Sequence, residues 1–147
     1  MDYFKGSEDL NKWNKTRTNV SRFFKLKNGQ WLKIVFTYKS KINIWFMSIV
    51  VANSKRQCND CINKTELSPK VTYGHITGNK CGLEPFKIAL KELLKFEKTV
   101  HNCEISVVGA SERLSNIYRR LTRYGYNIDS TPRKNGEKRN ILFKEIK

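Results

Sequence analysis

The chain has 147 residues, which suits a single domain over residues 1–147, and 29 Lys and Arg against 13 Asp and Glu give a formal net charge of +16. Aromatic residues make up 12% of the chain and lie in patterned segments, which excludes a disordered basic tail. The longest apolar run, residues 44–52, is far shorter than the roughly 20 residues of a membrane-spanning helix. Since residues 1–15 lack the apolar stretch of a signal peptide, we expect a cytoplasmic protein without a membrane partner.

The basic residues gather toward the two ends of the chain. Residues 1–60 carry a net charge of +8, residues 61–112 of +1, and residues 113–147 of +7. Such a field attracts polyanions, for example nucleic acid, an acidic protein or a phosphorylated cofactor. Charge alone does not choose among these partners, and a solvated basic surface explains many of the lysines equally well.

The N-terminal third is expected to form a short helix and a hairpin. Residues 7–15, within the N-terminal segment 1–20, have acidic side chains in their first turn and predict a short helix. Two β-prone runs, residues 23–27 and 30–38, flank the pair Asn28-Gly29. This pair predicts a hairpin turn in which both residues have positive φ.

The middle of the chain is expected to change from strands to a helix. Residues 42–52 predict a third strand that is buried on much of both faces, and the polar residues 53–70 predict a loop. Residues 71–77 predict a fourth strand. Apolar residues at helical spacing predict a helix over residues 82–98, which tolerates Pro85 in its first turn.

The last third is expected to place one helix between strands. Residues 104–108 predict a short strand, which can pair in parallel with residues 71–77. A helix follows, which Gly125 closes in the left-handed conformation, and residues 126–147 predict two more strands. The fold class is therefore expected to be α+β, with a single mixed, mostly antiparallel central sheet of about 6–7 strands flanked by helices.

Four cysteines raise the question of a metal site. Cys58 and Cys61 have the CxxC spacing of zinc ligands, but a closed site needs two more, and His75 and Cys81 are the candidates nearby. A second CxxC pair is absent. We therefore favour free thiols in a loop and expect no metal, with a zinc site as the alternative.

The most informative stretch joins the end of a strand to the start of a helix through a turn with two glycines, in residues 73–83. Helix N-termini expose unpaired N–H groups and a partial positive charge, which suit a phosphate. Gly78 and Gly82 allow the backbone to approach a pyrophosphate closely, and Lys80 adds charge. The stretch has neither a Walker GK[ST] nor a GxGxxG motif, so a plain strand–helix turn is the alternative.

The element order, this glycine turn and residues 117–126 together resemble the GNAT superfamily of acyl-CoA N-acyltransferases. The last helix of that family typically closes on Gly-Phe or Gly-Tyr, as residues 117–126 do at Gly125-Tyr126. Residues 77–84 combined with residues 118–120 also look like small phage-encoded members, which implies a host-cell cytoplasm or a virion as the location. The chain departs from the family where Ile76-Thr77 replaces the usual Gln or Arg before the glycines.

The resemblance implies an activity and a cofactor. The activity is acetyl transfer from acetyl-CoA to an amine of a protein, a nucleic acid or a small molecule. It implies an acyl-CoA cleft between the fourth and fifth strands, residues 71–77 and 104–108, with backbone N–H groups on the pyrophosphate. The cofactor-binding residues are then Thr77, Gly78, Asn79, Lys80, Cys81, Gly82 and Leu83.

Acetyl transfer to an amine needs a base for the acceptor ammonium and an acid for the leaving thiolate, and the sequence offers candidates for both. An amine acceptor arrives as an ammonium and must lose a proton before it attacks a thioester. The strand at residues 71–77 has no carboxylate, so His75 is the candidate base. Tyr73 shares a face of this strand with His75 and is a further catalytic candidate. Tyr118 is the candidate acid for the thiolate, one turn before the position where the family places a tyrosine. A structural histidine and a core tyrosine are the alternatives.

A second interpretation gives the chain a non-catalytic role on the same fold. A basic protein of this kind binds nucleic acid, or acts as a virion structural or anti-defence component, and Trp13 stacks on bases. The residues for polyanion contact are Arg119, Arg120, Arg123, Arg133, Lys134, Lys138 and Arg139. A solvated helix face is the alternative for them.

Overall fold

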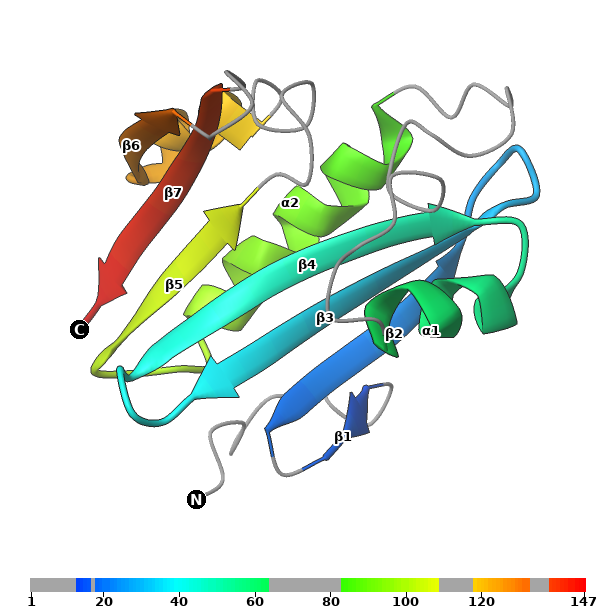
Figure 1. Ribbon diagram of the computed structural model, residues 1–147, viewed down its shortest axis with the longest axis horizontal. Helices are drawn as coiled ribbons and strands as arrows, with labels where there is room; N and C mark the ends of the chain where they lie inside the picture. The colour runs from blue at the N-terminus through cyan, green and yellow to red at the C-terminus, as the bar shows by residue number, and fades with distance from the viewer. Residues whose placement is uncertain (1–12, 17, 64–82, 109–117, 133–137) are drawn as a thin grey trace.

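The computed structural model describes residues 13–16, 18–63, 83–108, 118–132 and 138–147. Seven strands form one sheet in the order β1-β2-β3-β4-β5-β7-β6 (Figure 1). The strands are β1 (Asn14–Lys15), β2 (Asn19–Lys25), β3 (Trp31–Lys39), β4 (Ile44–Ala52), β5 (Cys103–Val108), β6 (Asn127–Pro132) and β7 (Lys138–Ile146). Neighbouring strands are antiparallel except β4 and β5, which are parallel. This confirms the expected α+β class with a single mixed, mostly antiparallel sheet.

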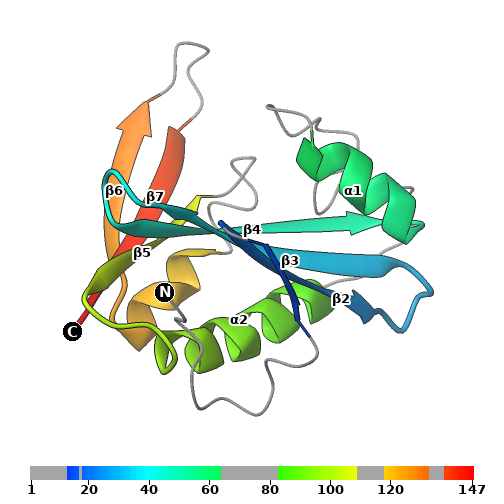
Figure 2. The same ribbon diagram turned by 90° about the horizontal axis from the view of Figure 1, so that it is seen from below.

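Helices cover both faces of the sheet. The described helices are α1 (Lys55–Asn63), α2 (Glu84–Glu97) and the 3-10 helix η2 (Arg119–Tyr124). In Figure 2, α1 lies on one side of the sheet, whereas α2 and η2 lie on the other. We call these the α1 face and the α2 face.

The core of the α2 face is aromatic. The rings of Phe36 on β3 and Phe96 on α2 are stacked, with centroids 3.9 Å apart, and the Trp45 ring of β4 meets Phe96 edge-on at 5.1 Å. The helix predicted over residues 82–98 is confirmed as α2, and Pro85 lies in its first turn. The predicted left-handed closure is confirmed too, since Gly125 ends η2 with φ of +91°.

Helix α1 corrects the prediction of a loop over residues 53–70. The Ser54 hydroxyl accepts a hydrogen bond from the Gln57 backbone N–H at 3.1 Å, and so caps the N-terminus of the helix. Cys58 is fully buried and packs α1 against β3 and β4. The helix is polar overall, and this composition is why the sequence predicted a loop here.

The prediction of a helix over residues 7–15 is wrong for residues 14 and 15, which form strand β1. Asn14 and Lys15 pair with Ser21 and Val20 of β2. Trp13 packs beside this strand, with its ring centroid 5.8 Å from that of Phe36. Edge pairing and the burial of an indole therefore outweigh a weak helical preference, while residues 7–12 lie outside the described residues.

The β2–β3 hairpin was predicted correctly, but its turn was not. Gly29 has φ of +89°, whereas Asn28 does not have a positive φ. The Leu26 N–H donates to the Gln30 carbonyl at 2.8 Å and the Gly29 N–H to the Leu26 carbonyl at 3.0 Å. The loop thus has three residues and needs the left-handed conformation at its last residue only.

Candidate functional site

The parallel pairing between β4 and β5 covers only the first part of β4. Residues Ile44–Met47 pair with residues Glu104–Val107, after which β4 continues to Ala52. Figure 1 shows the two strands diverging toward their C-terminal ends. Beyond Met47, no strand of the described residues pairs with the β5-facing edge of β4. The β4 residues beyond the ladder are nevertheless buried, with Ile49 at 4% and Val50, Val51 and Ala52 at 0–1% exposure. We call this place the β4–β5 ladder end.

This pairing corrects the predicted position of the cleft. Residues 71–77 were expected to pair in parallel with residues 104–108, but the two neighbours of β5 are β4 and β7. Over residues 44–47, β4 lies between β3 and β5 and pairs with both, and this central place suits its run of apolar residues. Residues 71–77 themselves, with Tyr73 and His75, lie outside the described residues.

Helix α2 begins near the same end of the sheet. The Glu84 carboxylate in its first turn accepts a hydrogen bond from the Lys27 N–H at 2.9 Å, which ties the helix to the β2–β3 loop. That loop precedes Trp31, the partner of the last β4 residue, Ala52. Of the predicted cofactor-binding residues, Leu83 is described and immediately precedes α2, where its carbonyl accepts the Lys87 N–H at 2.9 Å. The other six, residues 77–82, lie outside the described residues.

Tyr118, the candidate acid, is placed beside the first turn of α2. It is 2% exposed and belongs to the hydrophobic core. Its ring centroid lies 6.1 Å from that of Phe86 on α2. The arrangement matches the core-tyrosine alternative and also brings the phenol close to the helix that follows the glycine turn.

A partly buried group of charged and phenolic side chains joins η2 to its neighbours. Lys144 Nζ of β7 is 3.2 Å from Glu97 Oε2 of α2 and donates to the Tyr124 carbonyl at 2.9 Å. The Tyr126 hydroxyl is buried beside Glu97, and burial, followed by the negative charge of Glu97, raises its pKa. The group joins the end of η2 to α2 and β7.

The predicted polyanion-binding residues are described in part. Arg119, Arg120 and Arg123 are exposed on η2. Lys138 and Arg139 begin β7, but their side chains are outside the description, as are residues 133–134. Trp13 was expected to stack on bases, but it is half-buried against Phe36.

The cysteine pair lies on a helix rather than in the expected loop. Cys58 Sγ is buried beneath α1, 3.6 Å from the Trp31 carbonyl oxygen. The side chain of Cys61, and both His75 and Cys81, lie outside the description. Within the described ranges, no group of three or more His, Cys, Asp or Glu side chains could hold a metal ion.

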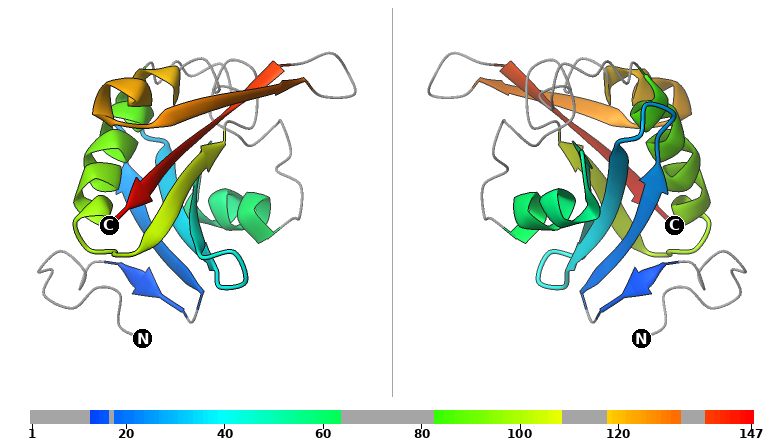
Figure 3. Two further views of the ribbon diagram at one scale, coloured as in Figure 1. Left: turned by 90° about the vertical axis from the view of Figure 1, so that its left-hand side faces the viewer. Right: turned by 90° about the vertical axis from the view of Figure 1, so that its right-hand side faces the viewer.

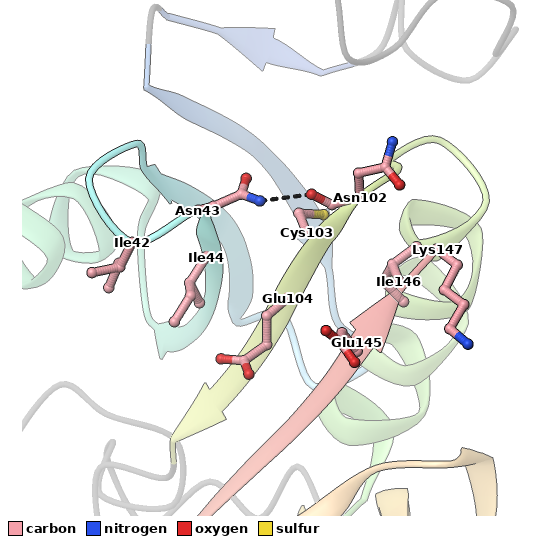
Figure 4. A pocket seen from close by; sticks show the side chains of 9 residues that line it. All are labelled: Ile42, Asn43, Ile44, Asn102, Cys103, Glu104, Glu145, Ile146 and Lys147. Carbon is pink, nitrogen blue, oxygen red and sulfur yellow. Dashed lines mark hydrogen bonds between the residues drawn. The ribbon is translucent and has the colours of Figure 1, made fainter.

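A pocket that the sequence did not predict lies at the N-terminal ends of β4 and β5 (Figure 4). Its volume is about 460 Å³, and Glu104 and Glu145 face each other across neighbouring strands at its wall. Asn43 and Asn102, both with φ of 54°, shape its rim, where Asn43 Nδ2 donates to the Asn102 carbonyl at 2.6 Å. This pocket and the β4–β5 ladder end are at opposite ends of the parallel pair.

In comparisons with known proteins, no protein-family model, curated protein or solved structure matches the chain. Among the described residues, no helix has the length and apolar character needed to cross a membrane.

Proposed function

We propose that the protein is an acyl-CoA-dependent N-acyltransferase that moves an acetyl group from acetyl-CoA to an amine. The observation that carries this proposal is the β4–β5 pair, the one parallel pair among the described strands. Its ladder ends while β4 continues, and α2 lies in the connection between the two strands. This arrangement agrees with the resemblance to the GNAT superfamily, which implies an acyl-CoA site between two parallel strands.

On this proposal, an acyl-CoA lies at the β4–β5 ladder end. The amide groups of its pantetheine arm would pair with backbone groups of β4 beyond Met47, where β5 does not pair with β4. Because residues 49–52 are buried, the arm would have to displace the atoms that cover them. The N–H groups of residues 78–83 would hold the diphosphate just before α2. A backbone N–H aimed at the thioester oxygen would stabilise the oxyanion that forms when the amine attacks.

The proton transfers fall to two side chains. His75 would remove the proton from the acceptor ammonium, because an imidazole titrates near neutral pH. Tyr118 would give a proton to the departing thiolate, and its place beside Phe86 and the first turn of α2 supports this role.

The test compares CoA with another polyphosphate, because a chain of net charge +16 attracts anions of many kinds. Melting temperatures are measured with acetyl-CoA, CoA and ATP at equal ionic strength. A ligand at 100 times its dissociation constant stabilises the folded state by about 2.7 kcal/mol, so CoA is expected to raise the melting temperature well above the value with ATP. An equal effect of CoA and ATP, with no release of CoA from acetyl-CoA in the presence of amines, would refute the proposal.

Two lysine variants locate the site. Lys80→Ala removes a charge from the glycine turn and is expected to weaken CoA binding about 10-fold, as the loss of a charge-assisted contact worth about 1.4 kcal/mol. Lys91→Ala removes the same charge from an exposed position of α2 and serves as the matched control. Equal affinity of the two variants would place the diphosphate elsewhere.

A further inference from the structure

The α1 face carries a cluster of three lysines around two aromatic rings, separate from the groups described above. It comprises Phe23 and Lys25 of β2, Trp31 and Lys33 of β3, and Lys55 at the start of α1, and we call it the lysine–aromatic cluster. The antiparallel register sets Phe23 opposite Lys33 and Lys25 opposite Trp31. Each ring therefore has an ammonium group as its cross-strand neighbour, and the first residue of α1 adds a third.

The ammonium groups lie on the rings at short distances. Lys25 Nζ is 4.7 Å and Lys55 Nζ 4.6 Å from the centroid of the Trp31 ring. Lys55 Nζ is also 5.4 Å from the Phe23 centroid, and Lys33 Nζ is 5.1 Å from it. The two rings are perpendicular, with centroids 6.4 Å apart. Three positive charges are thus held together by cation–π contacts on one aromatic base.

Among the side chains that the structure describes, no carboxylate pairs with the lysines of the cluster. None lies within 4.0 Å of Lys25, Lys33 or Lys55, and the side chain of Asp60 in α1 is outside the description. Lys33 Nζ donates instead to the neutral Asn59 amide oxygen of α1 at 2.7 Å. A bound anion would add the opposite charge that the described side chains do not supply.

The cluster also offers aromatic surface to a ligand. Phe23 and Trp31 are half-buried, while Lys25 and Lys55 are exposed on flexible side chains. These two ammonium groups can move from the ring faces to a phosphate and leave the rings to a planar group. A ligand that alternates phosphates with planar rings would therefore use both parts of the cluster.

We propose that the lysine–aromatic cluster binds single-stranded nucleic acid, with its lysines on backbone phosphates and Trp31 stacked on a base. A duplex keeps the faces of its bases within the stack, and an acidic peptide has no rings to match Trp31 and Phe23. Figure 3 shows that α1 and η2 lie on opposite sides of the sheet, so this surface is separate from the exposed arginines of η2.

The experiment measures the affinity of the full-length chain for a labelled 12-nucleotide single strand by fluorescence anisotropy, without CoA, between 50 and 200 mM salt. The charge variant is K25Q/K55Q, and the matched control is K39Q/K41Q, which removes two exposed lysines from the end of β3 and the turn that follows it. The cluster variant is expected to lose about 10-fold or more in affinity. Its slope of log K against log salt is expected to fall by about 1.4, as for two phosphate contacts on a single strand.

The stacking contact is tested with Trp31→Leu and Trp31→Phe. Leu is expected to weaken binding about 10-fold and Phe by much less, because base–aromatic stacking tolerates a smaller ring. Thermal unfolding checks that each variant folds. Three results would overturn the proposal: an equal loss in K39Q/K41Q, an equal affinity of Trp31→Leu and the unchanged chain, or cluster-dependent binding of a duplex or of poly-glutamate as tight as that of the single strand. None of these three results depends on whether the protein transfers acyl groups.

Discussion

Removal of the Phe96 ring tests how firmly α2 is attached to the sheet. Phe96 is 6% exposed, stacks on Phe36 with a 4° angle between the rings, and meets Trp45 edge-on. Truncation of a buried phenylalanine to alanine costs about 3–5 kcal/mol. With two ring contacts at this site, we expect Phe96→Ala to lower the free energy of unfolding by about 4 kcal/mol. This is a large share of the total free energy of unfolding of a folded domain, which is typically about 5–15 kcal/mol.

The assay is urea unfolding followed by circular dichroism. Lys91→Ala, on the exposed side of the same helix, is the control and is expected to change the free energy of unfolding by less than about 0.5 kcal/mol. A double-mutant cycle of Phe36→Leu and Phe96→Leu isolates the stacked pair, for which we expect a coupling of about 0.5–1.5 kcal/mol. A loss below about 2 kcal/mol for Phe96→Ala, or a coupling near zero, would show that α2 does not pack on β3 in this way.

The remaining predictions concern catalysis, alkaline stability and the two left-handed glycines. His75→Ala and Tyr118→Phe are each expected to slow acetyl transfer by about 100-fold in steady-state assays while the chain stays folded, and full rates in both would reject these roles. Tyr126 has a raised pKa when folded, so above pH 10 the unfolded chain loses a proton that the folded chain keeps, and stability falls as pH rises. Tyr126→Phe is expected to make this decline shallower in urea titrations from pH 9 to 11, and an unchanged decline would contradict the assignment. Gly125→Ala is expected to lower the free energy of unfolding in urea by about 1–2 kcal/mol. The backbone at Gly125 is left-handed, and an added Cβ would lie 3.4 Å from Lys144 Cε. Gly29→Ala is expected to cost about 1 kcal/mol, since its Cβ enters open space, and a larger loss than at Gly125 would count against this explanation.

Residue types along the chain suggested chemistry for the candidate site but did not determine its position. The glycines and Lys80 predict a phosphate-binding turn, which stays a prediction because residues 77–82 lie outside the described residues. The β4–β5 ladder ends where Met47 pairs with Val107, and these residues are sixty positions apart in the chain. No local sequence pattern therefore predicts where the ladder ends. The pocket at Glu104 and Glu145 depends in the same way on the register of β5 and β7.

The elements that the sequence by itself determined are those with a strong local signal. Alternating apolar residues define β3, helical spacing defines α2, and the conformational freedom of glycine places Gly29 and Gly125 at turns. Only the tertiary structure decided elements whose stability comes from distant contacts. Helix α1 depends on the burial of Cys58 against β3 and β4, and β1 on pairing with β2. The lysine–aromatic cluster likewise exists because strand register and one helix bring side chains from three segments together, and such contacts have no signature along the chain.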